Sequence, residues 1–346
     1  MNTNPKKDEE SSELFEHYRF DVDPGQKPLR LDKFLMLRIE NASRNKIQNA
    51  IKAGNVLVND QEAKSSYKVK PGDIITIVLE HPRREVEIIP QNIPINVVYE
   101  DKDIMLINKA PDMVVHPGHA NYEGTLLNAI AWHLEHHSKT PNPEMQAYLV
   151  HRIDKDTTGL LLAAKTELAQ SKLGYQFFHH TAKRKYQALV WGDFEEDEGT
   201  ITGHIGRDQK DRRRMSVYED GSYGKEAVTH YRVLKRYGYV SLVECELETG
   251  RTHQIRAHFK HIKHPLFNDA VYGGDIILKG TTFSKYKQFI DNCFRLLPRQ
   301  ALHAKSLGFV HPTSKKEMYF DSELPEDMQA VLKKWDTYTK DRLSKE

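Results

Sequence analysis

The chain has 346 residues, and its 51 lysines and arginines almost balance 49 aspartates and glutamates, so the formal net charge is +2. Hydrophobic residues make up 38% and charged residues 29%, which is typical of a globular protein of about two domains. No stretch reaches the roughly 20 apolar residues of a membrane helix, and the first residues lack the apolar core of a secretory signal. The two cysteines, Cys245 and Cys293, form no CxxC pair. We therefore expect a cytoplasmic protein with no membrane segment and no disulfide framework.

Residues 1–17 are polar, charged and poor in aromatic side chains, which predicts a disordered tail. Residues 18–80 form the first predicted domain, and the charged, proline-containing residues 81–93 are a predicted linker. In the first domain, apolar spacing and turn residues predict a helix over 31–39, a second helix between Ser43 and Gly54, and strands at 55–59 and 74–79.

Residues 94–336 form the larger predicted domain, followed by a frayed C-terminus at 337–346. Predicted strands alternate there with few helices, and the last two strands, 229–237 and 239–247, are expected to pair around Gly238. The helices are too few for a doubly wound parallel sheet. We therefore expect an α+β fold with a mostly antiparallel sheet.

Several kinds of site lack support in this sequence. It has no GxGxxG after a strand, no GxxxxGK[ST], no GxSxG and no HExxH, so nucleotide-binding, serine-hydrolase and zinc-protease motifs are absent. Four neighbouring histidines could suggest zinc or iron, namely His253, His258, His261 and His264. No acidic residue or cysteine lies among them, and their spacing drifts around a helix. We expect no metal and no cofactor.

Two polar segments stand out between apolar runs. His151–Gly159 places two cations and two carboxylates between strand-like segments, which is costly unless the charges pair or face a cleft. A tight turn in which Asp154 or Asp156 binds backbone amides explains the same residues. In 247–258, a strand ends near Gly250 and a helix opens with arginines and histidines, a pattern that suits a phosphate or carboxylate ligand. A solvated helix is the alternative.

These segments resemble the motifs of the RluA/RluD-type RNA pseudouridine synthases. The matching segments follow the family's order over about residues 95–320, and they are 108–118, 151–159, 185–190, 249–258, 264–273 and 299–304. Ile153 and Thr158 replace the leucine and serine that are more usual, and both changes keep the character of the side chain. Residues 20–80, with Arg30–Phe34, are similar to the S-four-like (alpha-L) RNA-binding domain of RluD-type members.

The resemblance implies an isomerase that breaks the N-glycosidic bond of an RNA uridine, turns the base and rejoins it through carbon, without a cofactor. Asp154 would be the nucleophile or the stabiliser of positive charge at the sugar, and Arg256 its partner, which keeps the carboxylate ionised. Tyr186 and Ile255 would face the target base from two sides, and Arg152 would support the displaced base after flipping. Further substrate-binding residues would be His116, Arg251 and His253.

Single residues also have purely structural interpretations: a capping role for Asp154, a salt bridge between Arg152 and Asp156, and core packing for Ile255. For the substrate, we expect ribosomal RNA, above all of the large subunit or a pre-ribosomal particle, bound by a monomer; relatives of the same domain also modify transfer RNA. Two other hypotheses are a non-catalytic RNA-binding or ribosome-assembly factor and a histidine-based metal hydrolase. Basic segments at 183–185 and 207–214 are candidates for phosphate contact.

Overall fold

The computed structural model divides into two compact units, Met1–Glu87 and Ile88–Glu346. It describes residues 15–39, 44–79, 88–118, 121–138, 146–211 and 213–344. The predicted N-cap Ser43 and residues 81–87 of the predicted linker lie outside this part of the chain. Each unit has its own hydrophobic core.

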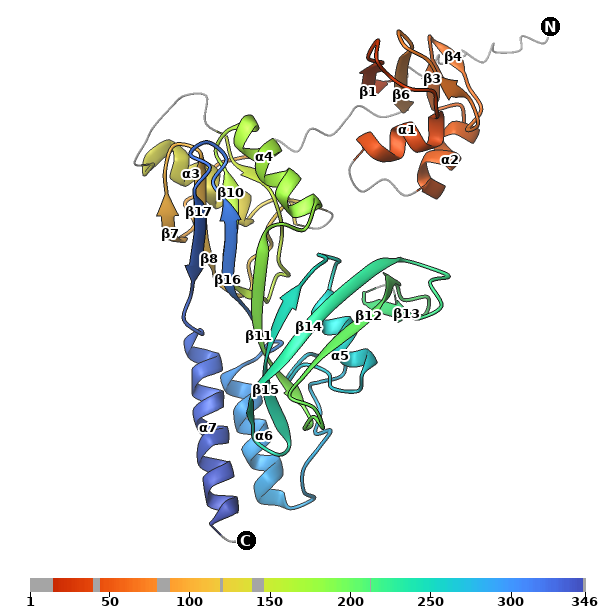
Figure 1. Cartoon of the computed structure of the whole chain (residues 1–346). Helices are drawn as coiled ribbons and strands as arrows, with labels where there is room; N and C mark the ends of the chain where they lie inside the picture. Colours follow the sequence, from red (N-terminus) through yellow and green to blue (C-terminus); the bar gives the residue numbers. More distant parts are fainter. Residues whose placement is uncertain are drawn as a thin grey trace, which may run out of the picture. The chain divides into compact units, whose positions relative to one another are not determined.

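The first unit packs two helices against a small sheet (Figure 1). Its elements are β1 (Phe15–Asp21), β2 (Leu29–Arg30), α1 (Leu31–Arg38), α2 (Arg44–Lys52), β3 (Val56–Val58), β4 (Gln61–Glu62), β5 (Lys68–Val69) and β6 (Ile74–Leu79). The strands run in the order β1-β6-β3-β4, with β2 and β5 forming a separate pair. Leu31, Phe34 and Leu35 are buried because their spacing places them on one face of α1. β1 begins at Phe15, inside the segment that the sequence predicts as a tail.

The second unit is built around one large sheet. Its strands are β7 (Asn96–Glu100), β8 (Ile104–Lys109), β9 (Tyr148–Leu149), β10 (Thr158–Ala164), β11 (Lys183–Trp191), β12 (Glu198–Arg207), β13 (Met215–Tyr218), β14 (Lys225–Arg236), β15 (Val240–Leu247), β16 (Leu302–Val310) and β17 (Glu317–Asp321). Its helices are α3 (Leu126–His136), α4 (Glu167–Phe178), α5 (Gln254–His261), α6 (Ser284–Leu296) and α7 (Glu326–Leu343).

The large sheet is mixed but mainly antiparallel, as the sequence predicts. Its main path runs β13-β12-β14-β15-β11-β16-β10-β8-β7. Among the described strands, β10 and β16 form the one parallel pair. The predicted pairing of β14 with β15 is confirmed, and Gly238 lies in their connection with a positive φ of 85°. The α+β fold with a small N-terminal domain is therefore confirmed.

Helices cover the sheet at separate places. In Figure 1, α6 and α7 lie side by side at the end of this unit opposite to α4. Trp335 of α7 is fully buried among side chains of α6 and β11, and Tyr338 packs against the same cluster. The residues from 337, which we expect to fray, therefore continue α7 to Leu343. None of the described helices is long and apolar enough to cross a membrane.

Candidate active site

Asp154 lies in the loop that leads into β10 and keeps 22% of its side chain exposed. Its Oδ2 accepts a hydrogen bond from Nη1 of Arg256 over 3.0 Å. In the described part of the chain, no backbone amide donates to this carboxylate, although the Asp154 carbonyl accepts one from Thr157. The structure thus favours a carboxylate presented beside an arginine over a capping aspartate.

Arg256 lies on α5, is 5% exposed, and binds a second carboxylate. Its Nε and Nη2 donate to the two oxygens of Asp269 over 2.7 and 2.9 Å. Burial alone would lower the pKa of Arg256, but the charges and hydrogen bonds of Asp269 and Asp154 raise it above its ordinary value. Arg256 therefore stays charged and keeps a fixed orientation toward Asp154.

A tyrosine and a histidine complete the surroundings of this ion pair. The Tyr272 ring centroid lies 4.9 Å from the Arg256 guanidinium carbon, and the Tyr272 hydroxyl accepts from the Met215 amide. Nδ1 of His253 is 3.1 Å from that hydroxyl, and its Nε2 is 3.9 Å from Oδ2 of Asp154. Burial lowers the pKa of His253. The ring therefore lies next to the carboxylate mainly in its neutral form near pH 7.

Gln254 anchors the start of α5 to the sheet. Its Oε1 accepts from the Thr249 hydroxyl and the Arg251 amide, and its Nε2 donates to the Val228 carbonyl and the Thr229 hydroxyl. His253, just before the helix, has a left-handed backbone with φ 54°. These contacts position the first turn of α5, which carries Arg256.

A buried apolar cluster includes Ile153, the residue before Asp154. Tyr186 of β11 and Ile255 of α5 are 8% and 4% exposed and belong to one buried cluster with Ile153. Burial raises the pKa of Tyr186, and the nearby charge of Asp154 acts in the same direction. The structure therefore places Tyr186 within reach of the Asp154 charge, and Ile255, which precedes Arg256 on α5, in the same buried cluster as Tyr186.

The remaining predicted residues are less closely joined to this centre. Arg152 is exposed, and its charge acts on His253; no described ion pair links it to Asp156. Nε of Arg251 donates to the Glu226 carbonyl over 2.9 Å. His116 is exposed, with Nδ1 2.7 Å from the Pro117 carbonyl, and no described polar contact joins it to the other candidates.

Comparison with known proteins identifies this arrangement. Residues 103–261 match the family model described as RNA pseudouridylate synthase, and residues 29–75 match that of the S4 domain. An uncharacterized RNA pseudouridine synthase of Chlorobaculum parvum is 44% identical over 91% of this chain and 96% of its own. The chain belongs to the RNA pseudouridine synthase family. It is therefore an isomerase whose partner is RNA.

Further members of this family are similarly close. YlyB of Bacillus subtilis, named an uncharacterized RNA pseudouridine synthase, is 42% identical over 89% of this chain and 94% of its own. The protein of Zymomonas mobilis named ribosomal large subunit pseudouridine synthase D is 39% identical over 88% and 93%. The solved structure of human RNA pseudouridylate synthase domain containing 1 has a TM-score of 0.50 at 25% identity, over 69% of this chain and 87% of that one. The domain containing 4 protein shares the fold, with a TM-score of 0.53 at 21% identity, over 70% and 93%.

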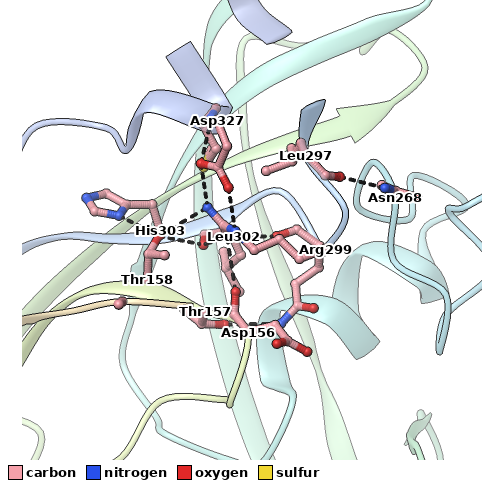
Figure 2. Close-up of polar contacts among 12 residues, drawn as sticks. Asp156, Thr157, Thr158, Asn268, Leu297, Arg299, Leu302, His303 and Asp327 are labelled. Carbon is pink, nitrogen blue, oxygen red and sulfur yellow. Dashed lines mark hydrogen bonds and ion pairs between the residues drawn. The ribbon is translucent and has the colours of Figure 1, made fainter. Parts of the chain in front are cut away.

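The sequence assigned no role to Arg299, which supports the loop that carries Asp154 (Figure 2). Its Nη1 donates to the Asp156 carbonyl over 3.0 Å, while Nε and Nη2 bind the two oxygens of Asp327 over 2.7 and 2.9 Å. Thr158 lies between Arg299 and Nδ1 of His303, which is 2.9 Å from the Thr158 hydroxyl. This network ties the residues after Asp154 to β16 and to the first turn of α7.

Lys109 is a second support that the sequence does not reveal. It is 1% exposed, and its ammonium donates to the carbonyls of Ala110, Met113 and Lys155 over 2.7, 3.1 and 2.7 Å. Burial lowers the pKa of Lys109 to about 8. Because Lys155 follows Asp154, this amine joins the 110–113 turn to the catalytic loop.

The four histidines that could suggest a metal have separate partners. Beyond His253, Nδ1 of His258 is 2.9 Å from the Thr229 hydroxyl, and Nε2 of His261 is 3.0 Å from a Glu219 oxygen. Nδ1 of His264 is 2.8 Å from the Trp191 carbonyl. These contacts point the rings toward different elements and explain their abundance without a shared ligand.

Proposed function

We propose that this synthase isomerises uridines of large-subunit ribosomal RNA, with Asp154 as the nucleophile on a flipped-out nucleotide. The observation that carries the proposal is the partly exposed Asp154 carboxylate, bound by Arg256 and within reach of Tyr186. A carboxylate in this setting can attack the sugar carbon that bears the base, or stabilise positive charge there, as the bond to N1 breaks. The base then turns, and its C5 bonds to the sugar carbon as the bond between that carbon and the Asp154 carboxylate breaks. C5 then loses its proton, and N1 regains one.

The other site residues act on binding and orientation. Tyr186 offers a ring face and a hydroxyl to the uracil, and Ile255 contacts it from the other side. Arg152, which is exposed, occupies the place of the displaced base, since a guanidinium can stack and also reach phosphate. His116, Arg251 and His253 contact the flanking RNA.

The choice of ribosomal RNA rests on relatives whose names state that substrate, including those of Zymomonas mobilis and Nitrosomonas europaea. The S4 domain, with its exposed basic side chains, is the proposed tether to the ribosomal RNA or a pre-ribosomal particle. A cytoplasmic monomer is the simplest form for this role, and a reducing compartment suits the free cysteines Cys245 and Cys293.

Release of tritium from C5 of uridine in ribosomal RNA tests the chemistry. Asp154→Asn should abolish release while RNA binding persists. Asp156→Asn is a matched control in the same loop, because Arg299 uses the Asp156 carbonyl and not its carboxylate, and it should stay active. Substantial release by Asp154→Asn would contradict the nucleophile, and binding by the wild type without release would favour a non-catalytic factor.

Mapping of pseudouridines in cells with and without the gene tests the substrate. Loss of sites in large-subunit ribosomal RNA is the expected result. Loss confined to transfer RNA would overturn the proposed substrate while leaving the chemistry intact.

A further inference from the structure

Three arginines of the catalytic unit are buried, and one of them differs from the other two. Arg184, Arg256 and Arg299 are 7%, 5% and 6% exposed. Arg256 and Arg299 each bind an aspartate through two nitrogens. Arg184 has no carboxylate within ion-pair distance in the described part of the chain. Buried charges are normally paired, so this guanidinium requires an explanation.

The hydrogen bonds of Arg184 leave it incompletely satisfied. Its Nη2 donates over long distances, 3.5 and 3.3 Å, to the carbonyls of Leu247 and Glu248. Its Nε is buried and has no hydrogen-bond partner among the described residues. A strong, geometrically fixed donor is thus left with weak partners, although unmade buried hydrogen bonds are costly.

A second cation lies close to Arg184. Arg251 follows Gly250, whose Cβ would lie 2.7 Å from Nη1 of Arg184, and its charge acts on Arg184. Arg251 is half-buried, with a backbone carbonyl as its described acceptor. His180 lies within the reach of both charges, and together with burial they lower its pKa. The charge of Glu248 acts on His180 in the opposite direction, but this carboxylate is itself paired with Nε2 of His230 at 2.6 Å. The group therefore has an excess of positive charge that a bound anion would relieve.

The position of this group relates it to the active site. Arg184 and Tyr186 are two apart on β11, so both side chains point to the same face of the sheet. Arg251 lies in the connection between β15 and α5, just before the helix that carries Arg256. In the same connection, a side chain on Gly250 would come within 2.7 Å of Nη1 of Arg184, so a glycine leaves this guanidinium its space.

We propose that Arg184 and Arg251 together bind one backbone phosphate of the RNA next to the flipped uridine. The guanidinium fork matches the geometry of phosphate oxygens, and the phosphate supplies the counter-ion that the described residues do not provide. This inference rests on the proposed function and adds which atoms of the substrate are held beside Tyr186.

Single neutral phosphates test the proposal. A ribosomal RNA fragment that the wild type modifies is prepared with one methylphosphonate at each position flanking the target uridine. Wild-type affinity should fall about 10- to 100-fold at one position, the range for a hydrogen bond to a charged group. Arg251→Gln should bind the unmodified fragment correspondingly more weakly and show no further loss at that position. Arg295→Gln, an exposed arginine on α6, should behave as the wild type.

A stability measurement separates binding from a structural role of Arg184. Because no described residue pairs with its charge in the free protein, Arg184→Met should weaken RNA binding without lowering the melting temperature. A lower melting temperature with unchanged phosphate dependence would overturn its part in the site. Tolerance of a neutral phosphate at every position, with normal tritium release, would overturn the phosphate site alone. If no ribosomal RNA fragment releases tritium, the proposed function fails, and this inference fails with it.

Discussion

Arg256 donates a hydrogen bond from Nη1 to Oδ2 of Asp154 across 3.0 Å. Its other nitrogens are taken by Asp269, which is 1% exposed and also accepts from the amides of Val271 and Tyr272. The backbone of the 269–272 turn thereby orients Asp269, which in turn orients the arginine. Asp269 acts on Asp154 only through Arg256, so it is a positioning residue.

Asp269→Asn should lower both stability and turnover. It removes one carboxylate from a buried arginine, which costs about 3 kcal/mol of unfolding free energy. It also frees the guanidinium to tilt, and a misplacement of about 1 Å can reduce kcat roughly 100-fold. Urea unfolding and tritium release measure the two effects.

A matched control separates instability from misalignment. Leu173→Ala truncates a fully buried side chain of α4 and should lower the unfolding free energy by about 2–5 kcal/mol. Leu173 belongs to a different core cluster from the neighbours of Arg256. It should leave kcat close to that of the wild type. Equal losses of kcat in the two variants would mean that Asp269 matters through stability alone.

Arg299→Lys should reduce kcat more than it changes KM. A lysine cannot bind both Asp327 oxygens and the Asp156 carbonyl at once, so the catalytic loop loses its support. We expect kcat to fall about 10- to 100-fold, as for a misplaced reacting group. The residues that bind RNA are untouched. Single-turnover and steady-state kinetics measure the split.

Asp336→Asn serves as the control, because Asp336 lies on α7 like Asp327 but pairs with Lys235 at the surface. It should leave both constants unchanged. An Arg299→Lys variant with normal kcat and a raised KM would show that the Asp156 carbonyl does not need this guanidinium.

Local features of the fold could be predicted because single residue types determine them. Thr166, a residue type preferred at helix caps, accepts from the Ala169 amide, and Gly54, at the predicted end of the second helix, has a positive φ of 75°. The pairing of β14 with β15 follows from apolar strands on either side of a glycine. The sequence predicts a frayed C-terminus at 337–346, whereas α7 runs to Leu343. Trp335 and Tyr338 stabilise this helix by packing against α6, which the local sequence does not show.

The centre of the site could be predicted from motif resemblance, and its supports could not. Lys109 binds three backbone carbonyls, including that of Lys155, and a carbonyl leaves no mark in the sequence. Arg299 and Asp327 lie in a loop and a helix whose contact depends on the packing of α7. Lys109, Asp269 and Arg299 all stand within matched segments, so a charged residue in such a segment is a signal that could have found them.

Buried histidines should make the catalytic unit sensitive to mild acid. Burial lowers the pKa of His151 to about 3 and those of His258 and His303 to about 4. The unfolded chain, with pKa values near 6.5, binds protons that the folded chain does not, so stability falls as pH drops from about 6.5 to 4. Each histidine contributes a loss of about 1.4 kcal/mol per pH unit within this window. Urea unfolding at pH 7.5, 6 and 5 measures the slope.

His258→Gln should reduce the slope of the unfolding free energy against pH by the contribution of one histidine, about 1.4 kcal/mol per pH unit. His258 is fully buried, and glutamine can keep a hydrogen bond to Thr229 without titrating. The change leaves His151 and His303 in place. An unchanged slope would show that His258 is protonated in the folded protein.

Removal of residues 1–87 should weaken RNA binding more than it slows the chemistry. The first unit has its own core, whereas Asp154 and Arg256 belong to the second unit. The exposed basic side chains of the first unit include Lys33, Arg38, Lys46, Lys52, Lys64 and Lys68. Each phosphate that the shortened protein no longer neutralises lowers the slope of log affinity against log salt by about 0.7–0.9. The truncated protein should therefore bind large-subunit ribosomal RNA with a shallower salt dependence, yet retain kcat on a short stem-loop that contains the target uridine. Equal affinity and an equal slope for the two proteins would show that the S4 domain is not the tether to RNA.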